Sequence, residues 1–397
     1  MWSEGLTFAL GADVYSDRMR SAQATVAAMR PHFAELGITR VARQTRLDRI
    51  GIPCFAAFRP NAQSLSMSAG KGLTDHAAMA SAVMEAAEYA IAERVAPAFR
   101  ASPRELDGAT MFDPSRMLPM GSRLDPELRI DWVMGSDLAT GAPSLVPFEI
   151  VSLATLSPQL AGLSRSTNGL ASGNTHEEAV FHAISELVER DATTLWSLKT
   201  LDDQLAQAID PQRFDDPVVE ALTAMVESAG LVLRLFDLTS DLPIPTIMAL
   251  IGPHDGGSYF ELASGTGTHP VAARAAIRAI TEAAQSRVTT IAGSGDDLDD
   301  LAFGAPAVPA ARALLAANPV GSPTRGLATG TPLQALSEWS RNILIDAGID
   351  ATIVPLDAAR FGVHAVRAVS VQLEDREANR NWRPGRRSVA RLLQVAA

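Results

Sequence analysis

The chain has 397 residues, 47% hydrophobic and 20% charged, so it can bury a large core in one large or two medium domains. Its formal net charge of −11 argues against general nucleic-acid binding, for which a basic face is the usual footprint. The start of the chain lacks a signal-peptide pattern, and no stretch reaches the roughly 18 apolar residues of a membrane span, so we expect a cytoplasmic protein.

The first predicted elements are a strand at residues 50–58 and a helix within residues 66–94. The strand contains Cys54, the only cysteine of the sequence, so no intrachain disulfide or thiolate metal cage can form. A buried core position fits this apolar run better than a nucleophile does.

The helical segment, SMSAGKGLTDHAAMASAVMEAAEYAIAER, begins with small residues that we predict to form a loop. It is not a Walker phosphate loop, because Leu65 occupies the position of the first glycine of that motif. In the helix, Ser81, Glu85 and Glu88 fall within about 60° of one another by the helical period. Two such glutamates usually belong to a solvated acidic face. Here the neighbouring Ala, Met, Val and Ile residues predict a buried helix, and buried carboxylates need partners.

Two stretches lack the pattern of a helix or a strand. Residues 101–147 are rich in Pro, Asp and Gly, and we predict a connecting arm there rather than core. Residues 296–331 form a second loose stretch. Neither composition is biased enough to predict disorder.

A second segment, STNGLASGNTHEEAVFHAISELVERDA at residues 166–192, repeats the small-residue loop followed by a helix. Either Asn174 or Thr175 can cap this helix. One side of it, within roughly 80° of arc, carries three acids, Glu178, Glu186 and Glu189. Arg190 is suited to bind phosphate, or else it pairs with Glu186 four residues earlier.

A third segment, ELASGTGTHPVAARAAIRAITEAAQSR at residues 261–287, has the same form and places Glu282 and Gln285 three positions apart. Alone, this spacing is a weak signal. The remaining predicted elements are helices at 217–229 and 333–347 and strands at 231–237, 246–251, 351–354 and 364–371.

The three segments share a pattern in which positions three apart lie on one face of a helix. Each helix can therefore aim two oxygen-bearing groups at one point, and oxygen ligands without sulfur or histidine suit Mg²⁺, which holds nucleotide phosphates. The seven histidines form no HExxH motif and no i, i+4 pair, which argues against a zinc hydrolase. We predict a Mg²⁺–nucleotide site where three helices converge, in an α/β (α+β) fold of mixed sheets with packed helices.

The three segments together resemble the three signature regions of YcaO-domain proteins, and residues 39–60, TRVARQTRLDRIGIPCFAAFRP, are similar to the lead-in of that family. The resemblance implies a YcaO-like domain at residues 37–397 after an N-terminal segment at 1–36. It also implies ATP and Mg²⁺ as cofactors and phosphorylation of a peptide backbone amide oxygen after a nucleophile attacks the carbonyl.

The resemblance further implies roles for ten residues of this chain. Those expected to contact the nucleotide or its water shell are Ser81, Glu88, Asn168, Glu178, Arg190 and Gln285. Those expected to hold magnesium are Glu85, Glu186, Glu189 and Glu282, and we take Glu85, Glu186 and Glu282 as the catalytic set.

The nucleophile decides the product. Azoline-forming YcaO cyclodehydratases commonly end in a proline-rich tail, whereas this sequence ends RRSVARLLQVAA. Its close, EDREANRNWRPGRRSVARLL, is more similar to YcaO proteins that work beside a TfuA partner and install a backbone thioamide. We therefore expect thioamide formation on a peptide or protein substrate, with azoline or amidine formation as alternatives and a RiPP natural-product pathway as one setting.

Other interpretations remain open. The chain could be a nucleotide-binding accessory or scaffold protein that stimulates another enzyme, or a structural oligomer whose glutamates form internal ion pairs. A homodimer is compatible with the sequence, because dimers are common among soluble enzymes. The arginine-rich tail is either solvated surface paired with acidic patches or a place where a peptide or partner docks; its arginines are Arg376, Arg380, Arg383, Arg386, Arg387 and Arg391.

Overall fold

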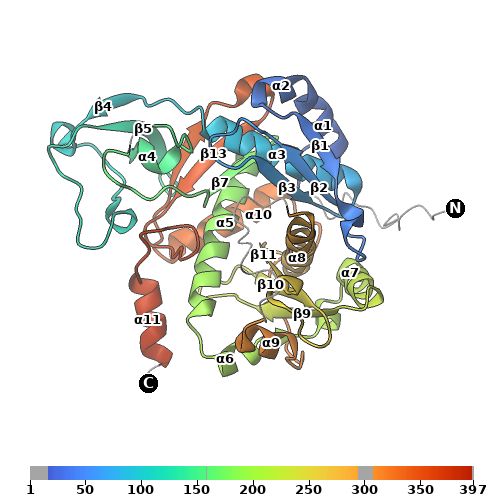
Figure 1. Ribbon diagram of the computed structural model, residues 1–397. Helices are drawn as coiled ribbons and strands as arrows, with labels where there is room; N and C mark the ends of the chain where they lie inside the picture. The colour runs from blue at the N-terminus through green and yellow to red at the C-terminus, as the bar shows by residue number, and fades with distance from the viewer. Residues whose placement is uncertain (1–16, 158, 294–306, 396–397) are drawn as a thin grey trace.

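Three antiparallel sheets form the framework of the protein in the computed structural model, which describes residues 17–157, 159–293 and 307–395 (Figure 1). The first sheet has the order β1-β2-β3, formed by β1 (Arg40–Arg43), β2 (Cys54–Phe58) and β3 (Met67–Lys71). The second has the order β11-β10-β9-β8, formed by β8 (Ala208–Ile209), β9 (Val232–Asp237), β10 (Thr246–Gly252) and β11 (Ala263–Thr268). The third has the order β4-β5-β12-β13-β7, with β6 paired to β5, formed by β4 (Phe99–Ala101), β5 (Ile130–Asp137), β6 (Pro143–Pro147), β7 (Leu170–Gly173), β12 (Thr352–Leu356) and β13 (His364–Val369).

Helices cover these sheets, which confirms the predicted class of packed helices and strands. They are α1 (Ala22–Met29), α2 (Phe33–Leu36), α3 (Asp75–Ala92), α4 (Phe148–Val151), α5 (His176–Ser197), α6 (Leu201–Leu205), α7 (Pro217–Ser228), α8 (Ala272–Ala292), α9 (Pro309–Leu315), α10 (Leu333–Asp346) and α11 (Arg386–Val395). We predicted mixed sheets, but the strand pairs within these sheets are antiparallel. Parallel pairing between described residues is limited to isolated bridges, Met111 with Leu145 and Ile209 with Gly321.

The three small-residue segments predicted as loops are strands β3, β7 and β11, each followed by one of the long helices α3, α5 and α8. Their glycines allow the helix to lie directly on the strand. A Cβ atom placed on Gly70 would come within 2.2 Å of the Ala78 carbonyl oxygen of α3. A Cβ atom on Gly267 would come within 2.3 Å of the Ala275 carbonyl oxygen of α8. The composition therefore reflects close packing rather than a turn.

Each of these strand–helix units also contacts the next one. Helix α3 packs on β3 and contacts β7, helix α5 packs on β7 and contacts β11, and helix α8 packs on β11 and contacts β3. The contacts thus run in a closed cycle of three. This arrangement turns the inner faces of α3, α5 and α8 toward one another.

The predicted connecting arm at residues 101–147 is wrong in its second half, because β5 and β6 belong to the third sheet. Within β5, Trp132 is only 1% exposed and its indole N–H donates to the Ala101 carbonyl at 2.9 Å. Many of the Pro, Asp and Gly residues lie in the turns around the strands, but Asp131 and Gly135 lie within β5 and Pro143 and Pro147 within β6, where they obscured the apolar alternation.

The other predicted elements are confirmed with small changes of their ends, as α7, α10, β9, β10, β12 and β13. Of the expected N-terminal segment 1–36, residues 1–16 lie outside the described part, and the rest contains α1 and α2. Of the loose stretch 296–331, residues 296–306 lie outside it, and the rest contains α9. Among the described residues, no helix is both long and apolar enough to cross a membrane.

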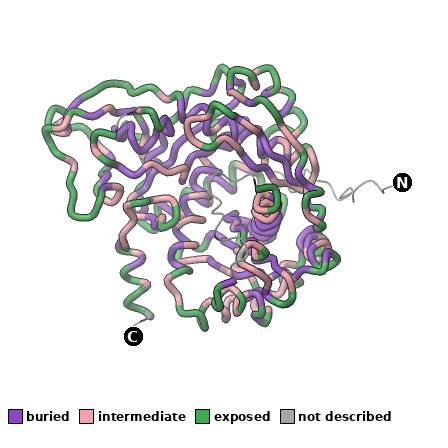
Figure 2. The backbone as a smooth tube through the Cα atoms, viewed as in Figure 1, coloured by how far each residue is buried: buried purple, intermediate pink, exposed green. Residues whose placement is uncertain are grey.

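Burial follows the layers, with buried backbone in the sheets and in the helices packed between them (Figure 2). Helices α3 and α8 are rich in buried alanines, as their apolar sequences predict. Cys54 is 1% exposed, and burial raises the pKa of its thiol to about 12. Its role as a core residue is therefore confirmed.

Candidate functional site

The cycle of strand–helix units encloses a polar cavity of about 340 Å³. Its wall is formed by Arg18, Lys71, Ser81, Met84, Glu85, Glu88, Tyr89, Thr167, Leu170, Ala171, Ser172, His182, Glu186, Glu189, Arg190, Thr266, Arg278, Glu282 and Gln285. The predicted convergence of the three helices is thus observed. Eight of the ten predicted site residues line this cavity, and their individual roles stay predictions.

The two exceptions are Asn168 and Glu178, which the structure does not place on this wall. Glu178 is fully buried behind it, where Arg18 donates to it at 2.8 Å and the Asn174 amide at 3.1 Å. Asn168 lines a separate small pocket of about 40 Å³. The helix cap is Thr175, whose side chain accepts the Glu178 backbone N–H, and Asn174 is therefore free to hold the Glu178 carboxylate.

Three acids on the wall bind side chains of the following strand–helix unit. The Glu88 carboxylate of α3 accepts hydrogen bonds from the Ser172 backbone N–H at 2.8 Å and from its hydroxyl at 2.7 Å, on β7. The Glu189 carboxylate of α5 accepts one from the Thr266 hydroxyl on β11 at 3.0 Å.

The third contact closes the cycle. The Glu282 carboxylate of α8 pairs with the Lys71 ammonium on β3. This contact links the third unit back to the first, in the order that the packing follows. The polar contacts and the packing therefore form the same ring around the cavity.

Glu85 and Glu186, also on the wall, form no ion pair with the described residues and are hard to ionise. Burial raises the pKa of Glu85 to about 8, and the negative charge of Glu88 adds to this effect. Burial likewise raises the pKa of Glu186 to about 8, although Arg190 opposes the shift. Lys71 instead lowers the pKa of Glu282 against its burial. A cation that entered the cavity would stabilise the ionised forms of Glu85 and Glu186.

The i, i+4 ion pair between Arg190 and Glu186, which the sequence left open, is not formed. Arg190 donates instead to Glu377, close to the C-terminal region, at 2.7 Å. Its buried Nε has no hydrogen-bond partner among the described residues. Arg190 therefore contributes positive charge to the cavity wall while one of its donors stays available.

The sequence analysis assigned no site role to three cations and one histidine of the wall, of which only Arg18 lies outside the three segments. Arg18 precedes α1, Lys71 ends β3 and Arg278 lies on α8, yet all three reach the same wall. His182 is 9% exposed, and neither ring nitrogen has a partner in the described part of the chain. Burial and the charges of Arg18 and Arg278 hold the pKa of His182 well below its usual range, so its ring is neutral.

The donor set fits a ligand that carries both cations and anions. No three acidic, histidine or cysteine side chains among the described residues meet closely enough to hold a metal ion by themselves. Mg²⁺ is usually held by one or two carboxylates together with phosphate oxygens and water. Buried glutamates beside arginines and a lysine supply complementary charges for such a metal–phosphate complex.

Comparisons with known proteins agree with this geometry. Residues 69–374 match a protein family described as YcaO cyclodehydratase, ATP- and Mg²⁺-binding. The chain is 42% identical over 304 residues to a protein encoded in the tfuA 3′ region of Rhizobium leguminosarum bv. trifolii, covering 72% of this chain and 70% of that protein. It is 38% identical over 279 residues to a protein of Methanothermobacter thermautotrophicus, covering 69% of this chain and 71% of that protein.

Two solved structures share the fold. One is YcaO from Methanopyrus kandleri bound with AMPPCP and Mg²⁺, at a TM-score of 0.69 and 24% identity, covering 91% of this chain and 94% of that chain. The other is a heterocyclase in complex with substrate and cofactor, at a TM-score of 0.73 and 22% identity. The match covers 90% of this chain but only 53% of the heterocyclase.

Proposed function

This chain belongs to the YcaO family of ATP-dependent enzymes that modify peptide backbones with ATP and Mg²⁺, and we propose that it installs a thioamide with a TfuA-type partner protein. The observation that carries the proposal is the ring of acids and cations around one cavity, contributed by all three strand–helix units. The relative encoded beside tfuA supports the choice of thioamide chemistry.

We assign four acids of the cavity to magnesium and its cations to the phosphates. Glu85, Glu186, Glu189 and Glu282 would hold the metal, which supplies positive charge to the triphosphate. Ser81, Glu88, Arg190 and Gln285 would contact the nucleotide or its water shell. Lys71, Arg18 and Arg278 join the cationic side of the wall. Glu178 would act indirectly, because it holds Arg18 at the cavity.

The proposed reaction balances as follows. Sulfide adds to the carbonyl carbon of a peptide bond, and the resulting oxyanion receives the γ-phosphoryl group of ATP, which leaves ADP. Phosphate then departs with the former amide oxygen, the sulfur loses its proton to solvent, and the C=S bond forms. An amide oxygen is a poor leaving group, and its phosphorylation removes that barrier. The protein needs no nucleophile of its own, which agrees with the inert, buried Cys54.

The test uses the protein with Mg²⁺, ATP, sulfide, a TfuA-type partner and a peptide whose target amide carries ¹⁸O. We expect one oxygen of the peptide to be replaced by sulfur and the ¹⁸O label to appear in inorganic phosphate. Label in phosphate with loss of water instead of sulfur gain would identify azoline formation. ATP-independent behaviour, with no label in phosphate, would contradict the proposal.

A matched pair of variants separates catalysis from an accessory role. Glu186→Gln should abolish label transfer, whereas Glu220→Gln, on the exposed face of α7, should leave it unchanged. If the protein only stimulates another enzyme, neither the wild type nor the Glu186→Gln variant should release labelled phosphate when that enzyme is absent. Equal label transfer by wild type and Glu186→Gln would rule out the assigned site.

A further inference from the structure

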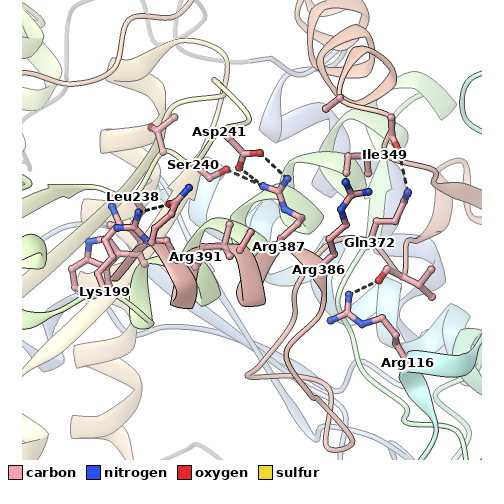
Figure 3. Close-up of a pocket in the computed structure, with 18 of the residues that line it drawn as sticks. Arg116, Lys199, Leu238, Ser240, Asp241, Ile349, Gln372, Arg386, Arg387 and Arg391 are labelled. Atoms are coloured by element: carbon pink, nitrogen blue, oxygen red, sulfur yellow. Dashed lines mark hydrogen bonds and ion pairs between the residues drawn. The ribbon is translucent and has the colours of Figure 1, made fainter. Parts of the chain in front are cut away.

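A second cavity lies outside the nucleotide site, where α11 passes the C-terminal end of α5 (Figure 3). Its volume is about 740 Å³, more than twice the 340 Å³ of the polar cavity enclosed by the three strand–helix units. It is lined by Trp196 near the end of α5, by Lys199 just after that helix, by residues 238–241 after β9, and by Arg386, Arg387 and Arg391 of α11. The proposed reaction assigns no role to this cavity.

Its wall is basic on an otherwise acidic protein. The charged side chains that line it are Arg116, Lys199, Arg386, Arg387 and Arg391, against Asp113 and Asp241. Five positive and two negative groups give a formal charge of +3, while the whole chain carries −11. Such a local reversal of sign attracts an acidic ligand.

Two of these cations serve the fold. Arg387 donates to Asp241 at 2.6 Å (Figure 3) and to Asp191 at 2.9 Å, and Arg116 donates to Glu374 at 2.6 Å.

The remaining cations are not neutralised in the described part of the chain. The Arg386 side chain has no ion pair or hydrogen bond there, and Figure 3 shows its guanidinium without an interaction. Arg391 donates only to Gln394 at 3.3 Å, and its buried Nε has no partner. Burial lowers the pKa of Lys199 to about 8, and the charge of Arg391 adds to this effect. Lys199 donates a hydrogen bond to the Gln207 amide oxygen at 2.7 Å, so these three cations have no ion pair in the described part of the chain.

The uncharged part of the wall is partly apolar, although Ser115, Thr239, Ser240, Gln372 and Gln394 also line it. Leu195, Trp196, Leu238, Ile349 and Val371 line the cavity. Helix α11 also exposes apolar side chains that do not line the cavity, with Leu393 at 66%. A free phosphate ion would use the cations alone and leave this surface uncovered. An acidic segment that also carries apolar side chains would satisfy both kinds of wall.

We propose that the cavity between α5 and α11 binds an acidic, partly apolar segment of a peptide or protein partner. The partner's carboxylates pair with Arg386, Arg391 and Lys199, and its apolar side chains cover Trp196 and Ile349. This inference does not depend on nucleotide binding, so its failure and the failure of the proposed reaction are distinguishable.

The test measures the fluorescence anisotropy of a labelled peptide of alternating glutamate and leucine with the full chain. We expect saturable binding that weakens as salt rises, and no binding of the matching lysine–leucine peptide. The double variant Arg386→Glu with Arg391→Glu should raise the Kd about tenfold or more, because two attractive pairs become repulsive. The matched control is Arg40→Glu on β1, which makes an equally large charge change per site on another sheet and should leave the Kd unchanged.

Glutamate at position 386 suits the first turn of a helix, so we expect α11 to remain folded, and thermal melting checks this. An unchanged Kd in the double variant would overturn the proposal, as would equal binding of both peptides. Complete displacement of the peptide by inorganic phosphate at equal ionic strength would identify a simple anion site and would also overturn it.

Discussion

Replacing Glu186 by glutamine should make the protein without metal more stable at alkaline pH, although it removes an assigned magnesium ligand. Glu186 lies on the cavity wall of α5, where burial raises its pKa to about 8 from an ordinary value of 4.5. Arg190 lowers this pKa but makes its own hydrogen bond to Glu377. The ionised carboxylate is therefore held at a cost that a neutral amide of the same shape avoids.

The size of the effect follows from the two pKa values. A rise from 4.5 to about 8 corresponds to about 5 kcal/mol against the charged form, and water in the cavity reduces this to about 2–5 kcal/mol. Because the folded-state pKa is the higher one, the stabilising contribution is complete below pH 4.5 and is lost as the pH rises through 8. The glutamine variant keeps this contribution at every pH, because its amide does not ionise.

Urea unfolding followed by circular dichroism, with EDTA present, at pH 5.5 and pH 8.5 measures this difference. We expect Glu186→Gln to exceed the wild type in free energy of unfolding at pH 8.5 and to approach it at pH 5.5. Glu220→Gln, on an exposed face, should show no such change between the two pH values. If Glu186→Gln falls below the wild type by the same amount at both pH values, Glu186 is an ordinary buried partner and the reasoning fails.

Three further predictions concern the packing and the ligand. Arg387→Ala should lower the free energy of unfolding by about 3–5 kcal/mol, because it leaves the fully buried Asp191 unpaired. The control Arg386→Ala should change it by less than about 0.5 kcal/mol. Equal losses for both variants in urea titrations would show that the pair is not stabilising. Gly267→Ala should cost at least about 1–3 kcal/mol, since the new methyl group meets the Ala275 carbonyl at 2.3 Å, and an unchanged thermal midpoint would show that α8 can move away freely. Mg²⁺ with a non-hydrolysable ATP analogue at one hundred times its Kd should add about 2.7 kcal/mol, which EDTA should reduce, and a melting curve that ignores both additions would contradict the assigned site.

The acid pattern was the part of the site that could be predicted from the sequence. Glu85 with Glu88 and Glu186 with Glu189 keep helical spacing in apolar surroundings, so periodicity alone places them on inner faces. The cations could not be found in this way. Arg18 reaches the wall through its ion pair with Glu178, 160 residues away, and no local pattern encodes such a contact.

The fold was predictable where a segment has a clear period and less so where small residues interrupt it. Strands β9 and β10 stand out as apolar runs, and their ends agree with prediction to about one residue. Strands β3 and β11 were mistaken for loops, because glycine is uncommon inside strands. The approach of a helix backbone to Gly70 and Gly265 explains the exception, and this tertiary contact is invisible to local propensity.

The ring of contacts has a consequence for the exchange of sequence between related proteins. Each acid and its partner are far apart in the chain, with 84 positions between Glu88 and Ser172 and 211 between Lys71 and Glu282. A chimaera that takes one strand–helix unit from a relative would import a carboxylate while its partner stays with the host. Recombination inside this domain is therefore expected to succeed only when all three units come from the same parent, or when the paired positions happen to match.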